Sequence, residues 1–355
     1  MRRGALSLAL LLVTVNAGCV NFRPPPKPVA AGLAGDAPSR VWTVRAGNRF
    51  TGRVETAGNM LYGGSIDRKV YAVDLSDGDV RWSRRLSGMI IGGVLLAGDT
   101  VFAASARPEG RVYALRRSNG KQIWRTSTPT VGAPLALIHG VLIAQTQRGE
   151  VFGLDPRNGK ILWRRRLGVA RVAAAPAGDG GVLVATTDSL FRLATRDGRV
   201  THKTVSPGTV VSPWLTQQEV LVAGTTDSQV VSIRPTTLQR NWSLRVDAPV
   251  LGAPAALGDT VYVATRAGTL YRIEPGNAPF LRLIAELDWP VTAPVTIARR
   301  QILLGGADGL IRALRTDGKE IWRVRVWRPV ELGLVTLGDG LIALGGNGDL
   351  HRFRQ

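Results

Sequence analysis

The sequence is poor in the residues that build disulfides and metal sites. It holds one cysteine, Cys19, and three histidines among 355 residues. A lone cysteine can form neither an intramolecular disulfide nor a cysteine-based metal cluster. The histidines, at positions 139, 202 and 351, are far apart in the sequence, which argues against a histidine-rich metal site. We also find no paired carboxylates, no Ser/His/Asp set and no phosphate-binding loop. The sequence therefore predicts no cofactor, no metal and no enzymatic activity.

Patterns typical of helices are also scarce. The apolar run at residues 4–15 is too short to span a bilayer as a helix, which needs about 20 residues. It follows a basic start and precedes small residues, which is typical of a secretory signal. The position of Cys19 resembles a bacterial lipobox, although Asn16 stands where leucine is usual. We expect residues 1–18 to be removed and Cys19 to be acylated, so that lipid anchors the chain to a membrane. An ordinary secreted protein with a chance cysteine is the alternative.

Residues 19–40 are rich in proline, alanine and glycine, with three consecutive prolines at 24–26. Such a composition predicts an extended tether that holds a folded domain, residues 41–355, away from the membrane. Val20 follows the cysteine where aspartate would favour the inner membrane, by resemblance to lipoproteins of double-membraned bacteria. We therefore expect an outer-membrane lipoprotein that faces the periplasm.

An alternating apolar segment recurs eight times, at intervals of 39 to 42 residues. The copies are VYAVD (70–74), VYALR (112–116), VFGLD (151–155), LFRLA (190–194), VVSIR (230–234), LYRIE (270–274), IRALR (311–315) and LHRFR (350–354). A period of about 40 with strand-like alternation is typical of a β-propeller, in which each repeat forms one four-stranded blade.

Each repeat reads as four strands. The first carries small residues and often proline, the second is apolar, and the third is the recurring segment. An Asn-Gly or Asp-Gly pair usually follows, which supplies the positive φ of a tight hairpin. The fourth strand carries a tryptophan in most repeats, and we predict that it packs between neighbouring blades: Trp82, Trp124, Trp163, Trp242 and Trp322. Two repeats have His202-Lys203 and Leu283-Ile284 instead.

The first and last segments predict how the ring closes. The eighth repeat ends at Gln355 without a fourth strand, whereas residues 41–46 carry Trp42 with no hairpin before it. Pairing the N-terminal strand with the last repeat would cover two otherwise exposed edges. We predict an all-β, eight-bladed β-propeller, monomeric, whose last blade is closed by the N-terminal strand.

The succession of a VYAL-type segment, an Asn-Gly-Lys turn and a tryptophan resembles the PQQ-like repeat over residues 41–355. Fold is strongly specified by this likeness and function weakly. One group with the repeat, the quinoprotein dehydrogenases, would imply a PQQ-binding enzyme. Those proteins are considerably longer and stack PQQ on a disulfide between adjacent cysteines, which this chain lacks, so this is the third hypothesis.

The second group is the BamB family of lipoproteins, which resembles the chain along its whole length. This resemblance implies a non-enzymatic scaffold that helps β-barrel proteins insert into the outer membrane and contacts the barrel protein BamA. Arg171, five residues before Pro176, matches an arginine in one contact loop of the family; an exposed loop arginine without a role is equally open. The second contact loop of the family carries Asp-x-Asp, whereas the equivalent stretch here, SPGTVVSP (206–213), has no carboxylate.

The chain carries a formal net charge of +20, with arginines clustered in the fourth strands: RWSRRL (81–86), WRRRL (163–167) and WRVRVWR (322–328). Solvated charge that blocks edge pairing is the simpler interpretation. The alternative is an envelope lipoprotein of the same fold that binds another partner or an anionic surface through this basic rim. We expect no nucleic-acid partner, because the chain is exported and shows no aromatic stacking platform.

Overall fold

The computed structural model describes residues 37–106, 110–178, 180–217, 219–276, 278–291, 293–326 and 328–354. These residues belong to one compact unit of the chain. The predicted signal peptide, Cys19 and the tether up to residue 36 lie outside the described residues. Within the described ranges the regular elements are all β-strands, and no helix there is long and apolar enough to cross a membrane.

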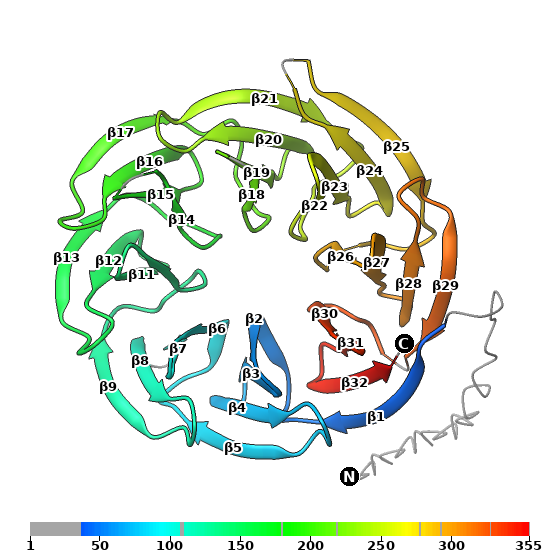
Figure 1. Ribbon diagram of the computed structural model, residues 1–355. Helices are drawn as coiled ribbons and strands as arrows, with labels where there is room; N and C mark the ends of the chain where they lie inside the picture. Colours follow the sequence, from blue (N-terminus) through cyan, green and yellow to red (C-terminus); the bar gives the residue numbers. More distant parts are fainter. Residues whose placement is uncertain are drawn as a thin grey trace, which may run out of the picture. The chain divides into compact units, whose positions relative to one another are not determined.

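In the described part of the chain, the strands form a ring of eight blades (Figure 1). Six blades are separate antiparallel sheets of four strands. Blades 1 and 2 are joined into one eight-stranded sheet through a single parallel bridge between Arg53 and Gly93. The predicted all-β, eight-bladed propeller is confirmed.

In blades 1 to 7 the strands run in chain order from the centre of the ring to its rim, and in blade 8 the outermost strand is β1. The first four blades are blade 1, β2 (Phe50–Ala57), β3 (Met60–Ser65), β4 (Lys69–Asp74) and β5 (Val80–Arg85); blade 2, β6 (Ile90–Ala97), β7 (Thr100–Ser105), β8 (Arg111–Arg116) and β9 (Gln122–Ser127); blade 3, β10 (Ala136–Ile138), β11 (Val141–Gln145), β12 (Glu150–Leu154) and β13 (Ile161–Arg166); and blade 4, β14 (Ala175–Pro176), β15 (Gly181–Ala185), β16 (Ser189–Ala194) and β17 (Val200–Val205). The other four are blade 5, β18 (Leu215–Gln217), β19 (Val220–Gly224), β20 (Gln229–Arg234) and β21 (Gln239–Arg245); blade 6, β22 (Ala255–Leu257), β23 (Thr260–Ala264), β24 (Thr269–Glu274) and β25 (Phe280–Glu286); blade 7, β26 (Thr296–Ala298), β27 (Gln301–Gly305), β28 (Leu310–Leu314) and β29 (Glu320–Arg325); and blade 8, β30 (Gly333–Leu337), β31 (Gly340–Leu344), β32 (Asp349–Arg354) and β1 (Ser39–Arg45).

Blade 8 is closed by the N-terminal strand, as predicted. β1 pairs with β32 in an antiparallel register that runs from Ser39 opposite Arg354 to Arg45 opposite Asp349. The strand begins at Ser39, so two residues assigned to the tether from the sequence belong to the blade. Both chain ends are thereby held in one sheet, which leaves no open blade in the ring.

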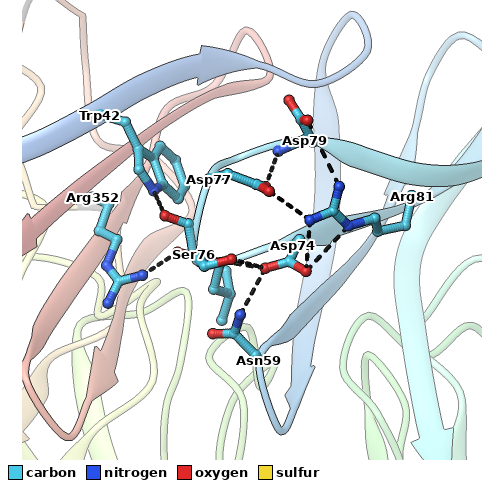
Figure 2. A network of polar contacts seen from close by, with 9 residues as sticks. Trp42, Asn59, Asp74, Ser76, Asp77, Asp79, Arg81 and Arg352 are labelled. Carbon is cyan, nitrogen blue, oxygen red and sulfur yellow. Dashed lines mark hydrogen bonds and ion pairs between the residues drawn. The ribbon is translucent and has the colours of Figure 1, made fainter.

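The junction between blade 8 and blade 1 is held by a polar network (Figure 2). The buried guanidinium of Arg352, on β32, donates to the carbonyl oxygen of Leu75 in blade 1 and to the carboxylate of Asp339 in its own blade. In the same turn, Asp74 accepts hydrogen bonds from Asn59, from the backbone and hydroxyl of Ser76, and from Arg81. The hydrogen bond from Arg352 to Leu75 ties the closing blade to the first one, and the Asp74 contacts, all within blade 1, hold the turn that receives it.

The hydrophobic core lies between blades. Each of the eight clusters of buried side chains among the described residues draws on two adjacent blades. One cluster, for example, packs Phe102 and Trp124 of blade 2 against Leu142 and Leu154 of blade 3. A single blade cannot bury both of its faces, so stability comes from the stacking of neighbours.

The inner strands approach one another closely, in agreement with the small residues found there in the sequence. A Cβ atom built on Gly252 of blade 6 would lie 2.1 Å from the carbonyl oxygen of Ala293 in blade 7. The backbone of Val295 also donates to the carbonyl oxygen of Ala253 across this interface, at 3.1 Å. Glycine is therefore required at this position by space.

The blade tryptophans lie at the interface with the following blade. Four of them donate the indole N–H to a backbone oxygen in the hairpin turn of that blade: Trp42 to Ser76 (3.2 Å), Trp82 to Arg117 (2.9 Å), Trp124 to Pro156 (2.9 Å) and Trp163 to Thr195 (2.8 Å). The ring also covers the glycine of the same turn. A Cβ atom on Gly198, whose φ is +67°, would lie 2.5 Å from the ring of Trp163. The Asn-Gly and Asp-Gly turns therefore form the hairpin and also leave room for a tryptophan ring to pack on their glycine.

The exceptions follow the same geometry. Blade 4 has His202 in place of the tryptophan, and the turn of blade 5 that would face it has Leu238 at φ 61° where other turns have glycine. Opposite His202 lies Arg192, whereas five of the six blade tryptophans are opposite glycine, alanine or serine; the exception is Trp42, which is opposite Arg352. The indole N–H of Trp322 is buried without an acceptor among the described residues, and the position in blade 8 that corresponds to Thr195 is Gln355, outside them.

Candidate partner-binding face

Arg171 lies on the loop that connects the outermost strand of blade 3 to the innermost strand of blade 4. Its neighbours Ala170 and Val172 are 3% and 4% exposed, so the alternation of the backbone turns the arginine side chain outward. The loop is anchored by a bridge between Ala170 and Thr186 and by a hydrogen bond of 2.9 Å from Gln145 Nε2 to the carbonyl oxygen of Val172. The Arg171 side chain makes no hydrogen bond or ion pair with any described residue, so a fixed backbone presents a free guanidinium.

The next connection, residues 206–213, lies beside this loop. Thr187, in the turn between β15 and β16, donates its backbone N–H to the carbonyl oxygen of Val169 at 3.1 Å. The hydroxyl of Thr209 in turn donates to the carbonyl oxygen of Thr187 at 2.9 Å. Two hydrogen bonds therefore join the loop of Arg171, the turn of blade 4 and the connection to blade 5.

Carboxylates reach this region from turns rather than from the 206–213 segment itself. A Cβ atom on Gly208 would lie 2.4 Å from Oδ1 of Asp227, which shows that the Asp227 carboxylate rests against this segment from the turn of blade 5. Asp188, in the turn of blade 4, is also exposed. The segment that lacks carboxylates in the sequence thus has one placed against it by folding.

Two exposed valines accompany these charges. Val205, at the end of β17, is 80% exposed, and Val169, in the loop of Arg171, is 40% exposed. We define the partner face as Val169, Arg171, Asp188, Val205 and Asp227. Only Arg171 was identified from the sequence. Val205 could have been noticed as an apolar residue at the end of a fourth strand, where most repeats have a polar side chain.

The other residues singled out from the sequence do not converge on this face. The six tryptophans, Trp42, Trp82, Trp124, Trp163, Trp242 and Trp322, are distributed over six blades and lie in interfaces between blades. Within the described ranges no three His, Cys, Asp or Glu side chains are grouped closely enough to hold a metal ion. The partner face therefore offers charge and apolar contact for recognition, and we see no chemistry for catalysis in it.

A buried titratable group lies in the closing blade, away from the partner face. His351 on β32 is 3% exposed, and its Nδ1 lies 3.0 Å from the hydroxyl of Thr43 on β1. Its Nε2 is buried and has no partner among the described residues. Burial, with a smaller contribution from the charge of Arg40, lowers the pKa of His351 below its usual value near 6.5.

Comparison with known proteins gives the chain a family. The sequence model of the family described as outer membrane protein assembly factor BamB matches residues 33–173, 108–237 and 208–279, which together span more than half of the chain. The BamB protein of Pseudomonas aeruginosa is 35% identical over 141 residues, which are 36% of this chain and 36% of that protein. The BamB protein of Salmonella typhimurium is 25% identical over 243 residues, 50% of this chain and 62% of that protein.

One relative bears the name of an enzyme. The tetrathionate hydrolase of Acidithiobacillus ferrooxidans is 29% identical over 136 residues, but the match covers only 27% of that protein and 31% of this chain. The repeat alone is therefore compatible with more than one function.

Solved structures agree with the fold. The crystal structure of BamB from Moraxella catarrhalis superposes with a TM-score of 0.75 at 18% identity and covers 90% of this chain and 100% of that one. A computationally designed protein, Ika8, superposes with a TM-score of 0.74 at 14% identity. Structural likeness at such identities reflects the propeller, whereas the sequence match over residues 33–279 is specific: the chain belongs to the BamB family of outer membrane protein assembly factors.

Proposed function

We propose that the chain is a non-enzymatic, lipid-anchored scaffold that supports insertion of β-barrel proteins into the outer membrane by contacting a BamA-type barrel protein. The observation that carries the proposal is the match of the family model to residues 33–279. The partner face adds support, because an exposed, unpaired arginine on a well-anchored loop beside exposed valines suits protein recognition.

The anchor in this proposal is Cys19. Acylation would hold the chain at the periplasmic side of the outer membrane, and the Pro-rich residues 19–36 would space the propeller from it. Several acyl chains are needed for stable anchoring, because one chain binds a membrane only marginally.

Arg171 is the proposed contact for a carboxylate of the partner. A guanidinium offers several N–H donors in a planar fork that fits a carboxylate with two parallel hydrogen bonds. Asp188 and Asp227 would face basic groups of the partner, and the exposed valines would be covered on binding. The partner would therefore present an acidic group opposite blade 3 and basic groups opposite blades 4 and 5.

Crosslinking in cells tests the proposal. The tagged lipoprotein is crosslinked, purified and analysed by mass spectrometry, in its natural form and as Arg171→Glu. We expect a BamA-type barrel protein among the captured partners, and at least a tenfold lower yield for the variant, because reversing one charge of a pair costs roughly 2–5 kcal/mol.

The matched control is Arg282→Glu. Arg282 is also an exposed arginine without a carboxylate partner among the described residues, but it lies on the outer strand of blade 6. Capture of the barrel protein should survive this change. Loss in both variants would mean that net charge matters and the partner face does not, and absence of any barrel protein from the natural chain would overturn the scaffold proposal.

A second candidate function is a lipoprotein of the same fold that binds another envelope partner or an anionic surface. The observation that favours it is the net charge of +20 with arginines concentrated in the outer strands. Recovery of other envelope components in place of a barrel protein, with binding weakened by salt, would support it.

A further inference from the structure

The same backbone hydrogen bond follows the end of the outermost strand in all eight blades. In every blade, the residue that follows this strand donates its backbone N–H to the turn between the second and third strands of the same blade. The donors and acceptors, from blade 1 to blade 8, are Leu86 to Arg68, Thr128 to Gly110, Leu167 to Gly149, Ser206 to Asp188, Val246 to Ser228, Leu287 to Gly268, Val326 to Gly309 and Ala46 to Gly348. This shared hydrogen bond makes the residues before the donors structurally equivalent and places them all at the same face of the ring.

Arginine occupies this position in five of the eight blades: Arg45, Arg85, Arg166, Arg245 and Arg325. All five are exposed, and none of their side chains makes an ion pair or hydrogen bond with a described residue. The other blades have Ser127, Val205 and Glu286 there. We call the five the arginine ring.

Three members of the arginine ring lie on consecutive blades. Arg325 ends β29 in blade 7, Arg45 ends β1 in blade 8, and Arg85 ends β5 in blade 1. Figure 1 shows these outer strands following one another along the rim, with β1 between β29 and β5. Arg85 is opposite Lys69 in the strand register, so basic residues also lie next to the arc.

Acidic side chains near this arc are engaged with other groups; Asp67, in the turn of blade 1, accepts hydrogen bonds from the hydroxyl of Tyr71 and the backbone of Lys69. Asp349, opposite Arg45 in the register, pairs with Arg328 at 3.3 Å, and Glu331 pairs with Arg49 at 3.4 Å. In blade 7, Asp308 pairs with Arg312 at 2.6 Å. None of these acidic side chains forms an ion pair with Arg325, Arg45 or Arg85.

We propose that the arc of Arg325, Arg45 and Arg85 docks onto the phosphate headgroups of an anionic membrane surface. Planar guanidinium groups are well suited to phosphate. The arc is centred on β1, the strand that follows the tether. The tether joins β1 at Ser39, at the opposite end of the strand from Arg45, so residues 19–36 would have to pass the rim of blade 8 for the arc to meet the membrane. The partner face lies on blades 3 to 5 of the same face of the ring, so docking through blades 7, 8 and 1 would tilt the ring and keep the partner face away from the membrane. The inference rests on the lipid anchor of the proposed function and adds an orientation to it.

The full chain, purified from membranes, is reconstituted into vesicles of neutral phosphatidylcholine or of phosphatidylcholine with phosphatidylglycerol. Exposed arginines are labelled with phenylglyoxal, and the labelling rate of each is measured by mass spectrometry. We expect Arg45, Arg85 and Arg325 to react several-fold more slowly on the anionic vesicles, and high salt to restore their rates. Arg240 and Arg282, exposed on blades 5 and 6, should react equally on both vesicles. The proposal would be overturned if labelling rates were equal on the two kinds of vesicle. It would also be overturned if Arg240 and Arg282 were protected as strongly as the three arginines of the arc.

A triple variant tests the arc. Because the replaced arginines can no longer be labelled, protection must be measured on another arginine. In Arg45→Gln/Arg85→Gln/Arg325→Gln, the nearby exposed Arg68 serves as the reporter. Since each basic residue contributes roughly 1 kcal/mol near an anionic surface, docking should weaken about 100-fold and Arg68 should lose its protection. The control Arg166→Gln/Arg245→Gln/Arg282→Gln removes the same charge and should leave Arg68 protected; loss of protection in both variants would reduce the effect to net charge.

The lipid anchor is tested separately, by flotation of the protein with vesicles. If the chain does not float with neutral vesicles, the lipid anchor has failed, and flotation with anionic vesicles then measures the arc alone. That flotation should be lost in the arc variant and kept in the control. Failure of the barrel contact, by contrast, appears only in the Arg171 crosslinking experiment.

Discussion

Replacing Gly198 by alanine should cost far more stability than its place in a surface turn suggests. Gly198 has φ +67°, and its added Cβ would lie 2.5 Å from the ring of Trp163, which is 5% exposed. The left-handed backbone alone costs roughly 1–2 kcal/mol for a residue other than glycine. Displacing a packed ring adds roughly 1–3 kcal/mol. We therefore expect Gly198→Ala to lower the free energy of unfolding by about 2–5 kcal/mol.

Gly140→Ala separates the two contributions. Gly140 lies in a turn of blade 3 with φ +75°, but an added Cβ would have no other atom within 4 Å of it. This variant should show the backbone cost alone, roughly 1–2 kcal/mol. The difference in unfolding free energy between the two glycine variants then measures the cost of displacing the Trp163 ring.

A double-mutant cycle completes the test. Trp163→Ala alone should cost roughly 3–5 kcal/mol, because it empties a buried site and leaves the carbonyl oxygen of Thr195 without its donor. In that background Gly198→Ala no longer meets a ring, so the double variant should be at least about 1 kcal/mol more stable than the sum of the two predicts. Stability is measured by urea unfolding with tryptophan-independent circular dichroism. Additive costs, or equal costs for the two glycine variants, would refute the proposed role of the turn glycine.

Two further predictions concern the closing blade. Arg352→Met should lower the free energy of unfolding by roughly 2–4 kcal/mol, because hydrogen bonds from a buried charge to Leu75 and Asp339 are lost. The control Arg354→Met removes an exposed arginine from the same Asp339 and should cost less than about 1 kcal/mol. Equal costs of the two variants in urea unfolding would contradict the role assigned to Arg352. His351 predicts a pH dependence: since its pKa is lowered in the folded state, the unfolded chain binds the proton first, and stability should fall as the pH drops below about 6.5 until the folded-state pKa is reached. His351→Leu should flatten this fall in stability below about pH 6.5, and an unchanged profile would show that another group titrates.

The partner face was only partly accessible from the sequence. Arg171 was found because the family pattern relates it to Pro176 by spacing, and both residues lie close together in the chain. The carboxylate beside that region was missed, because Asp227 belongs to a turn of another blade and meets Gly208 only through folding. The arginine ring was visible as basic fourth strands, but its equivalence depends on a backbone hydrogen bond in every blade.

The sequence by itself determined the repeat, the turns and the closure of the ring. These features are local: strand alternation, Asn-Gly and Asp-Gly turns and a tryptophan at a fixed offset act within one repeat of about 40 residues. Only the tertiary structure decided which side chains meet across blades, such as Arg352 with Leu75, Trp163 with Gly198, and Thr43 with the buried His351. The physical reason is that each blade buries its faces only against its neighbours, so burial and charge pairing are properties of the assembled ring.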